Sequence, residues 1–175
     1  MAWISAYFGL GSNEGDRRRN IREAVRMLDE ALGNPYSALS DIIETESWGF
    51  CSAPFLNACV RYRIIRKGTA AEQGHELLRI CKRIERALGR EEKVEYDSAG
   101  ERIYHDRPID IDILFFGKER IDCEDLIIPH PFIAERNFVL EPLRQVATLS
   151  LRRTFPAYFE NSFVNLHGKN KDKTI

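Results

Sequence analysis

The sequence lacks the features that would place the protein in a membrane or in an oxidising compartment. No run among its 175 residues approaches the ~20 consecutive apolar residues that span a bilayer. Residues 1–8 have neither the basic start nor the long apolar stretch of a signal peptide. The four cysteines (Cys51, Cys59, Cys81 and Cys123) form no C-x-x-C pair and no zinc-binding spacing. We therefore expect reduced thiols and a cytoplasmic protein.

The chain also lacks an excess of charge of either sign. It carries 26 Lys and Arg residues against 27 Asp and Glu residues, which gives a net charge of -1 at pH 7. A balance this even produces no overall basic field that would attract nucleic acid or an anionic membrane. We therefore expect no nucleic-acid partner and no membrane partner.

Apolar spacing predicts four strands and two helices. Asp16 is a suitable N-cap for a helix that ends at Gly33, and Thr69 with Glu72 has the capping-box spacing for a second helix that ends at Gly89. The strands are expected at residues 3–10, 37–45, 56–65 and 109–116. This order of elements is that of two split β-α-β halves. It predicts an α+β, ferredoxin-like βαββαβ sandwich, with an antiparallel sheet whose helices pack on one face.

The two strongest strand patterns assign side chains to faces. In residues 56–65, every second side chain from Leu56 is apolar and the others include Asn57 and Cys59, which predicts a half-buried strand. In residues 109–116, one face is expected to hold Ile109, Ile111, Ile113 and Phe115.

The C-terminal part is predicted to be an extension of one domain. A partly helical segment reaches residue 147, after which the apolar periodicity is lost. The charged stretch 169–173 has the composition of a disordered tail. We therefore predict a domain over residues 1–147 and a partly disordered extension over residues 148–175.

Two aspartates give the strongest signal of chemistry. Asp110 and Asp112 alternate with isoleucines on a predicted strand, so their carboxylates project from one face, ~6.6 Å apart along the chain. Two such carboxylates repel each other and resist desolvation, and a divalent cation resolves both problems. Oxygen ligands of this kind suit a Mg²⁺ ion that also holds phosphates, and Arg107 lies close enough to hold a phosphate oxygen. The alternative is an exposed sheet face with two solvated aspartates.

A second group of residues is suited to a flat ligand. Thr45 and Asn57 border a hairpin that also carries Trp48, Phe50 and Phe55. Such a set could sandwich a planar heterocycle and hydrogen-bond its edge. Aromatic side chains that simply fill the core are an equally good explanation.

Three further features have ordinary structural explanations. The glycines of residues 9–15 match neither a Walker nor a Rossmann pattern, so a strand-to-helix turn explains them. Lys82 and Glu85 are spaced as a surface ion pair on the second helix. His130, between two prolines, has the setting of a structural histidine.

Taken together, several separated motifs resemble those of the 6-hydroxymethyl-7,8-dihydropterin pyrophosphokinase family. The resemblance covers roughly residues 3–147, in the order and spacing of that family. The motifs are Gly11-Ser12-Asn13, Phe55-Leu56-Asn57, residues 106–115, Ile128-Pro129-His130-Pro131 and residues 135–143. The family has a ferredoxin-like fold and transfers pyrophosphate from ATP to a dihydropterin in folate biosynthesis.

The resemblance implies roles for the matching positions. It places two Mg²⁺ ions on Asp110 and Asp112, and it makes these aspartates catalytic together with Arg90 and Arg107. The positions implied in ATP binding are Glu85, Arg90, Arg107, Ile113, His130 and Arg136. The positions implied in pterin binding are Thr45, Gly49, Phe55, Asn57 and Phe138.

Two positions depart from the family pattern. Lys82 stands where the family often has Gln. The second basic residue of the family's mobile loop falls near Glu92 or Lys93, and Arg102 is the alternative within the longer loop of this chain.

The resulting prediction is a cytoplasmic, monomeric Mg²⁺-dependent diphosphokinase that acts on ATP and 6-hydroxymethyl-7,8-dihydropterin. An RNA-binding module of the same fold is the first rival, but it would need aromatic side chains where Asp110 and Asp112 lie. A regulatory small-molecule-binding domain is the second, and it would leave the aspartate pair unexplained.

Overall fold

The computed structural model describes residues 2–46, 53–91, 95–96, 98–100, 102–103 and 105–160. Its centre is an antiparallel sheet with strand order β2-β4-β1-β7, in which β3 also pairs with β4. The strands of this sheet are β1 (Trp3–Ser12), β2 (Ala38–Leu39), β3 (Ile43–Thr45), β4 (Phe55–Ile65) and β7 (Asp110–Phe116). The predicted second strand is therefore split into two short strands, both of which pair with β4.

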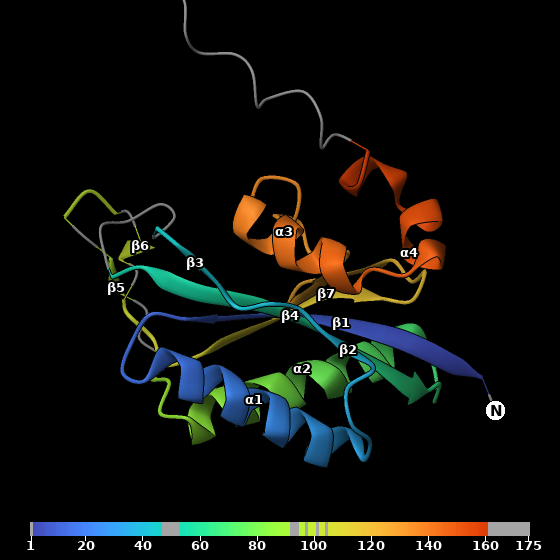
Figure 1. Ribbon diagram of the computed structural model, residues 1–175, viewed down its shortest axis with the longest axis horizontal. Coiled ribbons are helices and arrows are strands. Elements are labelled where there is room, and N and C mark those ends of the chain that lie inside the picture. Colours follow the sequence, from blue (N-terminus) through green and yellow to red (C-terminus); the bar gives the residue numbers. More distant parts are fainter. Residues whose placement is uncertain are drawn as a thin grey trace, which may run out of the picture.

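Two long helices cover one face of this sheet, α1 (Arg17–Leu32) and α2 (Ala70–Ala87) (Figure 1). The Asp16 carboxylate caps α1 by accepting from the Arg19 N–H, and Gly33 ends it with φ 70°. Thr69 and Glu72 form the predicted capping box of α2. With these elements in the order β-α-β-β-α-β, the α+β ferredoxin-like prediction is confirmed.

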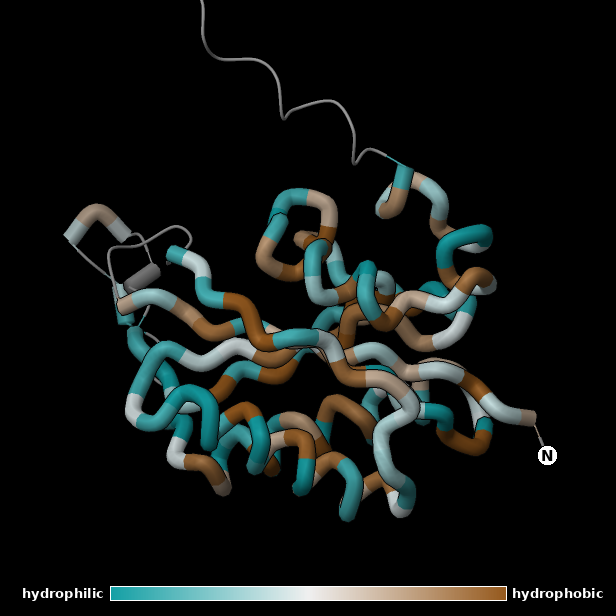
Figure 2. Tube along the Cα trace, in the orientation of Figure 1, coloured by the Kyte–Doolittle hydropathy of each residue, from teal (hydrophilic) through white to brown (hydrophobic). Residues whose placement is uncertain are grey.

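A second helical layer lies on the opposite face of the sheet. It consists of α3 (Asn137–Val146), α4 (Leu149–Thr154) and the 3₁₀ turn η1 (Pro156–Tyr158) (Figure 1). Leu140 and Leu143 of α3 pack on Tyr7, Cys59 and Leu114, which point up from the sheet. Figure 2 shows the resulting distribution, with apolar residues along the strands and hydrophilic residues on the outer sides of the helices.

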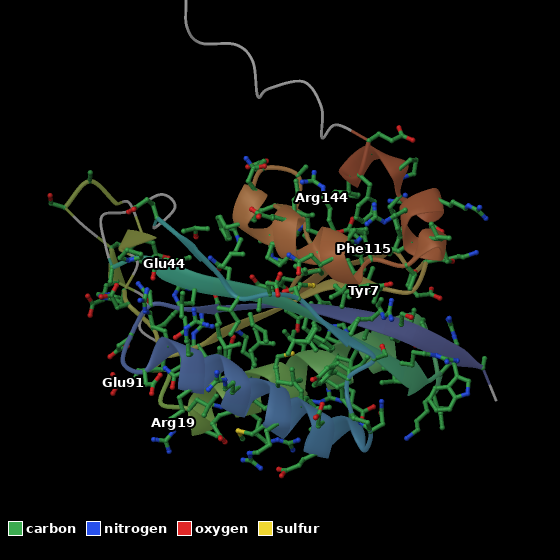
Figure 3. All side chains as sticks on the ribbon, viewed as in Figure 1. Tyr7, Arg19, Glu44, Glu91, Phe115 and Arg144 are labelled. Carbon is green, nitrogen blue, oxygen red and sulfur yellow. The ribbon has the colours of Figure 1, made fainter. Side chains whose placement is uncertain are left out.

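The upper layer changes two expectations about the strands. Asn57 and Cys59 of β4 are buried, at 6 % and 1 % exposure, because α3 covers the face that the alternation alone leaves open to solvent. Phe115 does not share a face with Ile113, because a shift in the β1–β7 register between Tyr7 and Phe8 leaves Leu114 as an extra residue. Phe115 therefore packs with Tyr7 beneath α4 (Figure 3), at a centroid separation of 6.3 Å.

The segment after residue 147 is structured as far as the description extends. Leu151 and Phe155 are buried against the upper face of the sheet, and the Phe155 ring lies 5.0 Å from that of Phe115. The predicted disorder of residues 169–173 stays a prediction, because these residues lie outside the described part of the chain.

Two small hairpins complete the described structure. β5 (Glu95–Tyr96) pairs with β6 (Arg102–Ile103), and β8 (Ile121–Cys123) pairs with β9 (Leu126–Ile128). The three described cysteines, Cys59, Cys81 and Cys123, are free thiols, and Cys51 lies outside the described residues. None of the described helices is long and apolar enough to cross a bilayer.

Candidate active site

The central strand places two glycines between the polar residues of its neighbours. Gly11 of β1 pairs with Asn57 of β4 on one side and with Asp110 of β7 on the other, and Gly9 pairs with Asp112. A Cβ atom on Gly11 would lie 3.3 Å from Asn57 Oδ1 and 3.5 Å from Phe55 Cδ1. The glycines thus form a floor without side chains between an amide and two carboxylates.

A pocket of about 160 Å³ opens above this floor. We call it the first pocket. It brings together eight of the residues predicted from the sequence: Thr45, Phe55, Asn57, Arg107, Asp110, Asp112, Arg136 and Phe138. Glu46, Val139 and the two glycines also line it and were not predicted. The i, i+2 spacing of Gly9 and Gly11 on a strand was the signal that could have identified the floor.

The amide and aromatic side of the first pocket is preorganised. Asn57 donates through Nδ2 to Thr45 Oγ1 at 2.8 Å, which fixes the amide while its other end faces Gly11. The guanidinium of Arg107 lies 5.8 Å from the centre of the Phe55 ring, and that of Arg136 lies 5.9 Å from the Phe138 ring. Flat aromatic faces and cationic groups therefore line the same space.

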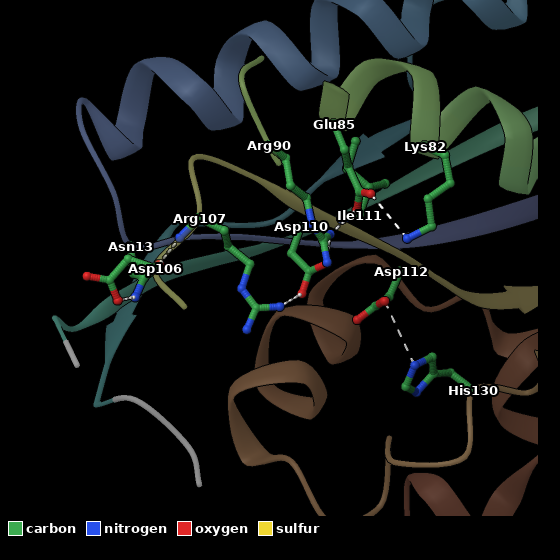
Figure 4. Close-up of polar contacts among 10 residues, drawn as sticks. All are labelled: Asn13, Lys82, Glu85, Arg90, Asp106, Arg107, Asp110, Ile111, Asp112 and His130. Atoms are coloured by element: carbon green, nitrogen blue, oxygen red, sulfur yellow. Dashed lines mark hydrogen bonds and ion pairs between the residues drawn. The ribbon is translucent and has the colours of Figure 1, made fainter. Parts of the chain in front are cut away.

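Asn13 explains why the loop before β7 is held against the end of β1. Its Nδ2 donates to Asp106 Oδ1 at 2.8 Å, and its Oδ1 accepts from the Arg107 N–H at 2.8 Å (Figure 4). Its own backbone N–H donates to the Arg107 carbonyl at 3.2 Å. Asn13 is 4 % exposed, so it acts as a buried clamp that sets where Arg107 leaves the backbone.

Asp110 is paired with two arginines. Its Oδ1 accepts from Arg90 Nη1, and its Oδ2 lies 3.1 Å from Arg107 Nη1 (Figure 4). Burial opposes ionisation of Asp110, but the charges of Arg90 and Arg107 outweigh it and hold its pKa below the ordinary value. Asp110 is therefore an anion across the neutral pH range.

Glu85 lies behind this pair, at the end of α2. Its side chain is 2 % exposed, and it accepts from the Ile111 N–H at 2.7 Å and from Arg90 Nη1 at 2.6 Å. Lys82 Nζ lies 3.3 Å from its other oxygen. The predicted Lys82–Glu85 ion pair thus exists, but its acid is buried, because β7 and Arg90 cover the side of α2 where Glu85 lies. Burial raises the pKa of Glu85, and the Arg90 charge opposes this.

Asp112 faces a second pocket as well as the first. The second pocket is lined by Lys82, Asp112, Ile113 and His130 together with residues of the β8–β9 hairpin. Desolvation and the neighbouring Asp110 raise the pKa of Asp112 to about 7. Burial and the Arg136 charge lower the pKa of His130 to about 4, so its imidazole is neutral at pH 7 and its 3.9 Å approach to Asp112 is not an ion pair. Asp112 therefore stands where the two pockets meet.

Some predicted residues lie outside the described part of the chain. These are Trp48, Gly49, Phe50, Glu92 and Lys93. Among the described residues, no three His, Cys, Asp or Glu side chains gather into a metal-binding group. Asp110 and Asp112 are the two carboxylates of β7 that line the first pocket.

Comparisons with known proteins identify the family of this chain. A family model described as 7,8-dihydro-6-hydroxymethylpterin-pyrophosphokinase (HPPK) matches residues 7–148. The chain is 43 % identical over 143 residues to the 2-amino-4-hydroxy-6-hydroxymethyldihydropteridine pyrophosphokinase of Porphyromonas gingivalis, a match that covers 81 % of this chain and 89 % of the relative. The corresponding Bacillus subtilis enzyme is 37 % identical over 142 residues, which cover 81 % of this chain and 77 % of that enzyme.

Larger proteins contain a similar segment. The "Folate synthesis bifunctional protein" of Arabidopsis thaliana is 44 % identical over 135 residues, which cover 77 % of this chain but only 25 % of the plant protein. A crystal structure of an HPPK-DHPS in complex with substrates has the same fold, with a TM-score of 0.60 at 16 % identity, covering 91 % of this chain and 44 % of that one. By its match over residues 7–148 and its identity to near full-length relatives, the chain belongs to the 7,8-dihydro-6-hydroxymethylpterin-pyrophosphokinase family.

Proposed function

We propose that the protein transfers a pyrophosphoryl group from ATP to the hydroxymethyl group of 6-hydroxymethyl-7,8-dihydropterin. The products are AMP and the pterin diphosphate, and the reaction is a step of folate biosynthesis. Family membership supports the reaction type. The assignment of individual residues rests on the geometry of the two pockets.

The observation that carries the proposal is the position of Asp112. It lines both the first pocket, with its amide and aromatic side chains, and the second pocket, with Lys82 and His130. A bisubstrate transfer needs an acceptor and a donor to meet at one charged centre. Asn57, Gly11 and Asp110 lie side by side on three neighbouring strands, and the absence of a side chain on Gly11 leaves room there for both substrates.

The first pocket suits the pterin. Asn57 is held by Thr45, so its amide can hydrogen-bond the edge of a flat ring without a loss of side-chain freedom on binding. Phe55 and Phe138 supply ring faces for stacking. Arg107 and Arg136 now lie over these rings, and a bound heterocycle would replace the arginines there and leave them to the phosphates.

Arginines from separate segments suit the triphosphate. Arg90 follows α2, Arg107 precedes β7, and Arg136 precedes α3. The Nε atom of Arg107 is buried and makes no hydrogen bond with any described residue, so it is a donor that still needs an acceptor. A phosphate oxygen would satisfy it. His130 is uncharged at pH 7, and its Nδ1 accepts from the Phe132 N–H at 3.3 Å, so Nε2 carries the proton and can donate one hydrogen bond at the second pocket.

Asp110 and Asp112 fit Mg²⁺. They are hard oxygen donors on one face of β7, and both burial and the charge of Asp110 raise the pKa of Asp112, two penalties that a bound cation would relieve. When bound, Mg²⁺ neutralises phosphate charge and polarises the phosphate oxygens. Two carboxylates leave the remaining ligand positions to phosphate oxygens and water.

The chain's own residues then orient the transfer. The first pocket holds the hydroxymethyl oxygen in line with the β-phosphorus, where a new O–P bond forms as the bond from that phosphorus to the α-phosphate oxygen breaks. The hydroxyl proton passes to solvent water, and AMP leaves with the bridging oxygen. Arg90 and Arg107 stabilise the charge that moves onto the transferred group and the leaving phosphate.

Nucleotide analysis tests the proposal directly. The protein is incubated with ATP, Mg²⁺ and 6-hydroxymethyl-7,8-dihydropterin, and the nucleotides are separated. AMP in equal amount to the pterin diphosphate is expected. Pterin-dependent ADP would show γ-phosphoryl transfer instead, and the absence of any pterin-dependent turnover would refute the function.

Asp110→Ala and Asp112→Ala test the site within that function. Each is expected to lower kcat by orders of magnitude while the far-ultraviolet circular dichroism remains that of the wild type, because neither side chain is part of the apolar core. Asp122→Ala, an exposed aspartate of the β8 strand, is the matched control and should retain full activity. Turnover near the wild-type rate in either site variant at saturating Mg²⁺ would contradict the assignment.

A further inference from the structure

Glu85 is placed to act on the site without touching a substrate. It lines neither pocket, and its side chain is 2 % exposed. Its bond to the Ile111 N–H ties it to β7 directly beside Asp110. The distance between the Glu85 and Asp110 carboxylates is therefore set by the packing of α2 on β7.

One guanidinium nitrogen is shared between these two carboxylates. Arg90 Nη1 donates to Glu85 Oε1 at 2.6 Å and also to Asp110 Oδ1 (Figure 4). Arg107 holds the other oxygen of Asp110. Both oxygens of Asp110 are thus engaged by arginines, and an incoming cation competes with them for the same carboxylate.

Because Arg90 Nη1 is shared with Glu85, the hydrogen bond between Arg90 and Asp110 is weakened. A guanidinium that faces a single carboxylate can form two parallel hydrogen bonds with it, which is its strongest pairing. Here Arg107 holds the second oxygen of Asp110, and Glu85 draws Arg90 Nη1 toward α2, so the bond from Arg90 Nη1 to Asp110 is a single, shared hydrogen bond. When Arg90 leaves Asp110 for a phosphate, Glu85 still holds it near the site, so the exchange does not expose an unpaired charge.

We propose that Glu85 is a positioning residue that draws Arg90 away from Asp110. It thereby sets the affinity of the site for the divalent cation that accompanies the nucleotide. This inference rests on the proposed function. It differs from the role in direct ATP contact that the family resemblance implied for Glu85, because Glu85 acts here through Arg90.

The test measures Mn²⁺ as a probe of the cation site. Binding of Mn²⁺ is followed by electron paramagnetic resonance in the presence of an ATP analogue with a methylene group between the α- and β-phosphates. Glu85→Gln keeps the shape of the side chain and removes its charge. We expect roughly tenfold weaker Mn²⁺ binding, the effect of about one charge-assisted hydrogen bond.

Two kinetic measurements accompany the Mn²⁺ binding experiment. The Mg²⁺ concentration for half-maximal activity should rise by about the same factor, while kcat at saturating Mg²⁺ changes by about twofold or less. Glu76→Gln removes the same charge from the exposed side of α2 and is expected to leave Mn²⁺ affinity unchanged. A loss in both variants would indicate a general charge effect and overturn the proposal.

A double variant that lacks the Arg90 charge provides the decisive test. In Arg90→Gln, the further change Glu85→Gln should leave Mn²⁺ affinity unchanged, because the group through which Glu85 acts is gone. A tenfold loss that persists in that background would refute the positioning role. Wild-type affinity in the single variant Glu85→Gln would refute it as well.

A second variant covers the case in which Glu85→Gln does not fold. Glu85→Asp keeps the charge but is one methylene too short to reach both Ile111 and Arg90, so weaker Mn²⁺ binding is expected. Wild-type affinity in that variant would show that charge alone matters and overturn the proposal. If the wild type itself shows no nucleotide-dependent Mn²⁺ binding, the proposed function fails and this inference fails with it, which is a different result from failure of the Glu85 variants alone.

Discussion

Replacing Asn13 by alanine should damage both stability and activity, although Asn13 touches neither pocket. Asn13→Ala removes two hydrogen bonds of 2.8 Å that hold Asp106 and the Arg107 N–H at the end of β1. The Arg107 N–H is half-buried and would lose its side-chain acceptor. Leaving such a donor unsatisfied costs about 1–3 kcal/mol, which lowers the Tm of a chain of this size by about 3–9 °C.

The functional cost comes from the position of Arg107. Its side chain pairs with Asp110 at 3.1 Å and lies over the Phe55 ring, so a shift of its backbone moves a cation at the centre of the site. A displacement of about 1 Å in a positioning group costs up to 10²-fold in rate. We therefore expect kcat/KM to fall about 10- to 100-fold.

Thermal unfolding followed by circular dichroism and steady-state measurement of AMP release test this reasoning. Asn20→Ala is the matched control, because Asn20 Nδ2 donates to the exposed Glu14 carbonyl at 2.9 Å, away from the site. Its Tm should shift by only about 1–2 °C. An Asn13→Ala protein with wild-type Tm and kcat/KM, or equal losses in the two variants, would show that the clamp does not place Arg107.

Three further predictions address the pocket floor, the upper layer and the pH dependence of stability. Gly11→Val should raise KM for the pterin by about tenfold or more, because the new side chain would contact Asn57 and Phe55, and an unchanged KM would refute the pocket assignment. Phe155→Ala should lower the free energy of unfolding by about 3–5 kcal/mol, measured by chemical denaturation, whereas Leu149→Ala, at 71 % exposure, should change it little; equal effects would mean that α4 is not part of the core. The raised pKa of Asp112 means that the metal-free native state binds its proton up to about pH 7, so this group's contribution to stability is fully present below its ordinary pKa and is lost as the pH rises to about 7. Asp112→Asn should therefore increase Tm relative to the wild type at pH 8 and not at pH 4, and a difference that is the same at both pH values would contradict the crowding of the two aspartates.

Local signals in the sequence were sufficient for the elements that depend on neighbouring residues. The Asp16 cap, the Thr69–Glu72 capping box and the left-handed Gly33 all act within a few residues of the chain, and all are present. The alternation of Asp110 and Asp112 with isoleucines likewise determined that both carboxylates share a face of β7. The family motifs then indicated which chemistry to expect there.

Other features depended on contacts between distant segments. The burial of Asn57 and Cys59 requires α3, which begins about 80 residues later in the sequence. The helix α4 has only six residues, which is too short to display a helical periodicity in the sequence. It is stabilised by the contact of Leu151 and Phe155 with the sheet. Contacts between distant segments cannot be predicted from the apolar periodicity within one short stretch of sequence.

The sequence by itself determined the fold class, the metal-ligand candidates and the family, because strand alternation, helix caps and spaced motifs are properties of short segments. The tertiary structure alone decided that Gly9 and Gly11 form the floor between Asn57 and the aspartates, that Asn13 clamps the loop of Arg107, and that Glu85 shares Arg90 with Asp110. Each of these relations joins residues brought together only when β1, β4, β7 and α2 pack. Strand register and burial, which arise from the packing of the whole chain, determine which charges meet and how strongly they interact.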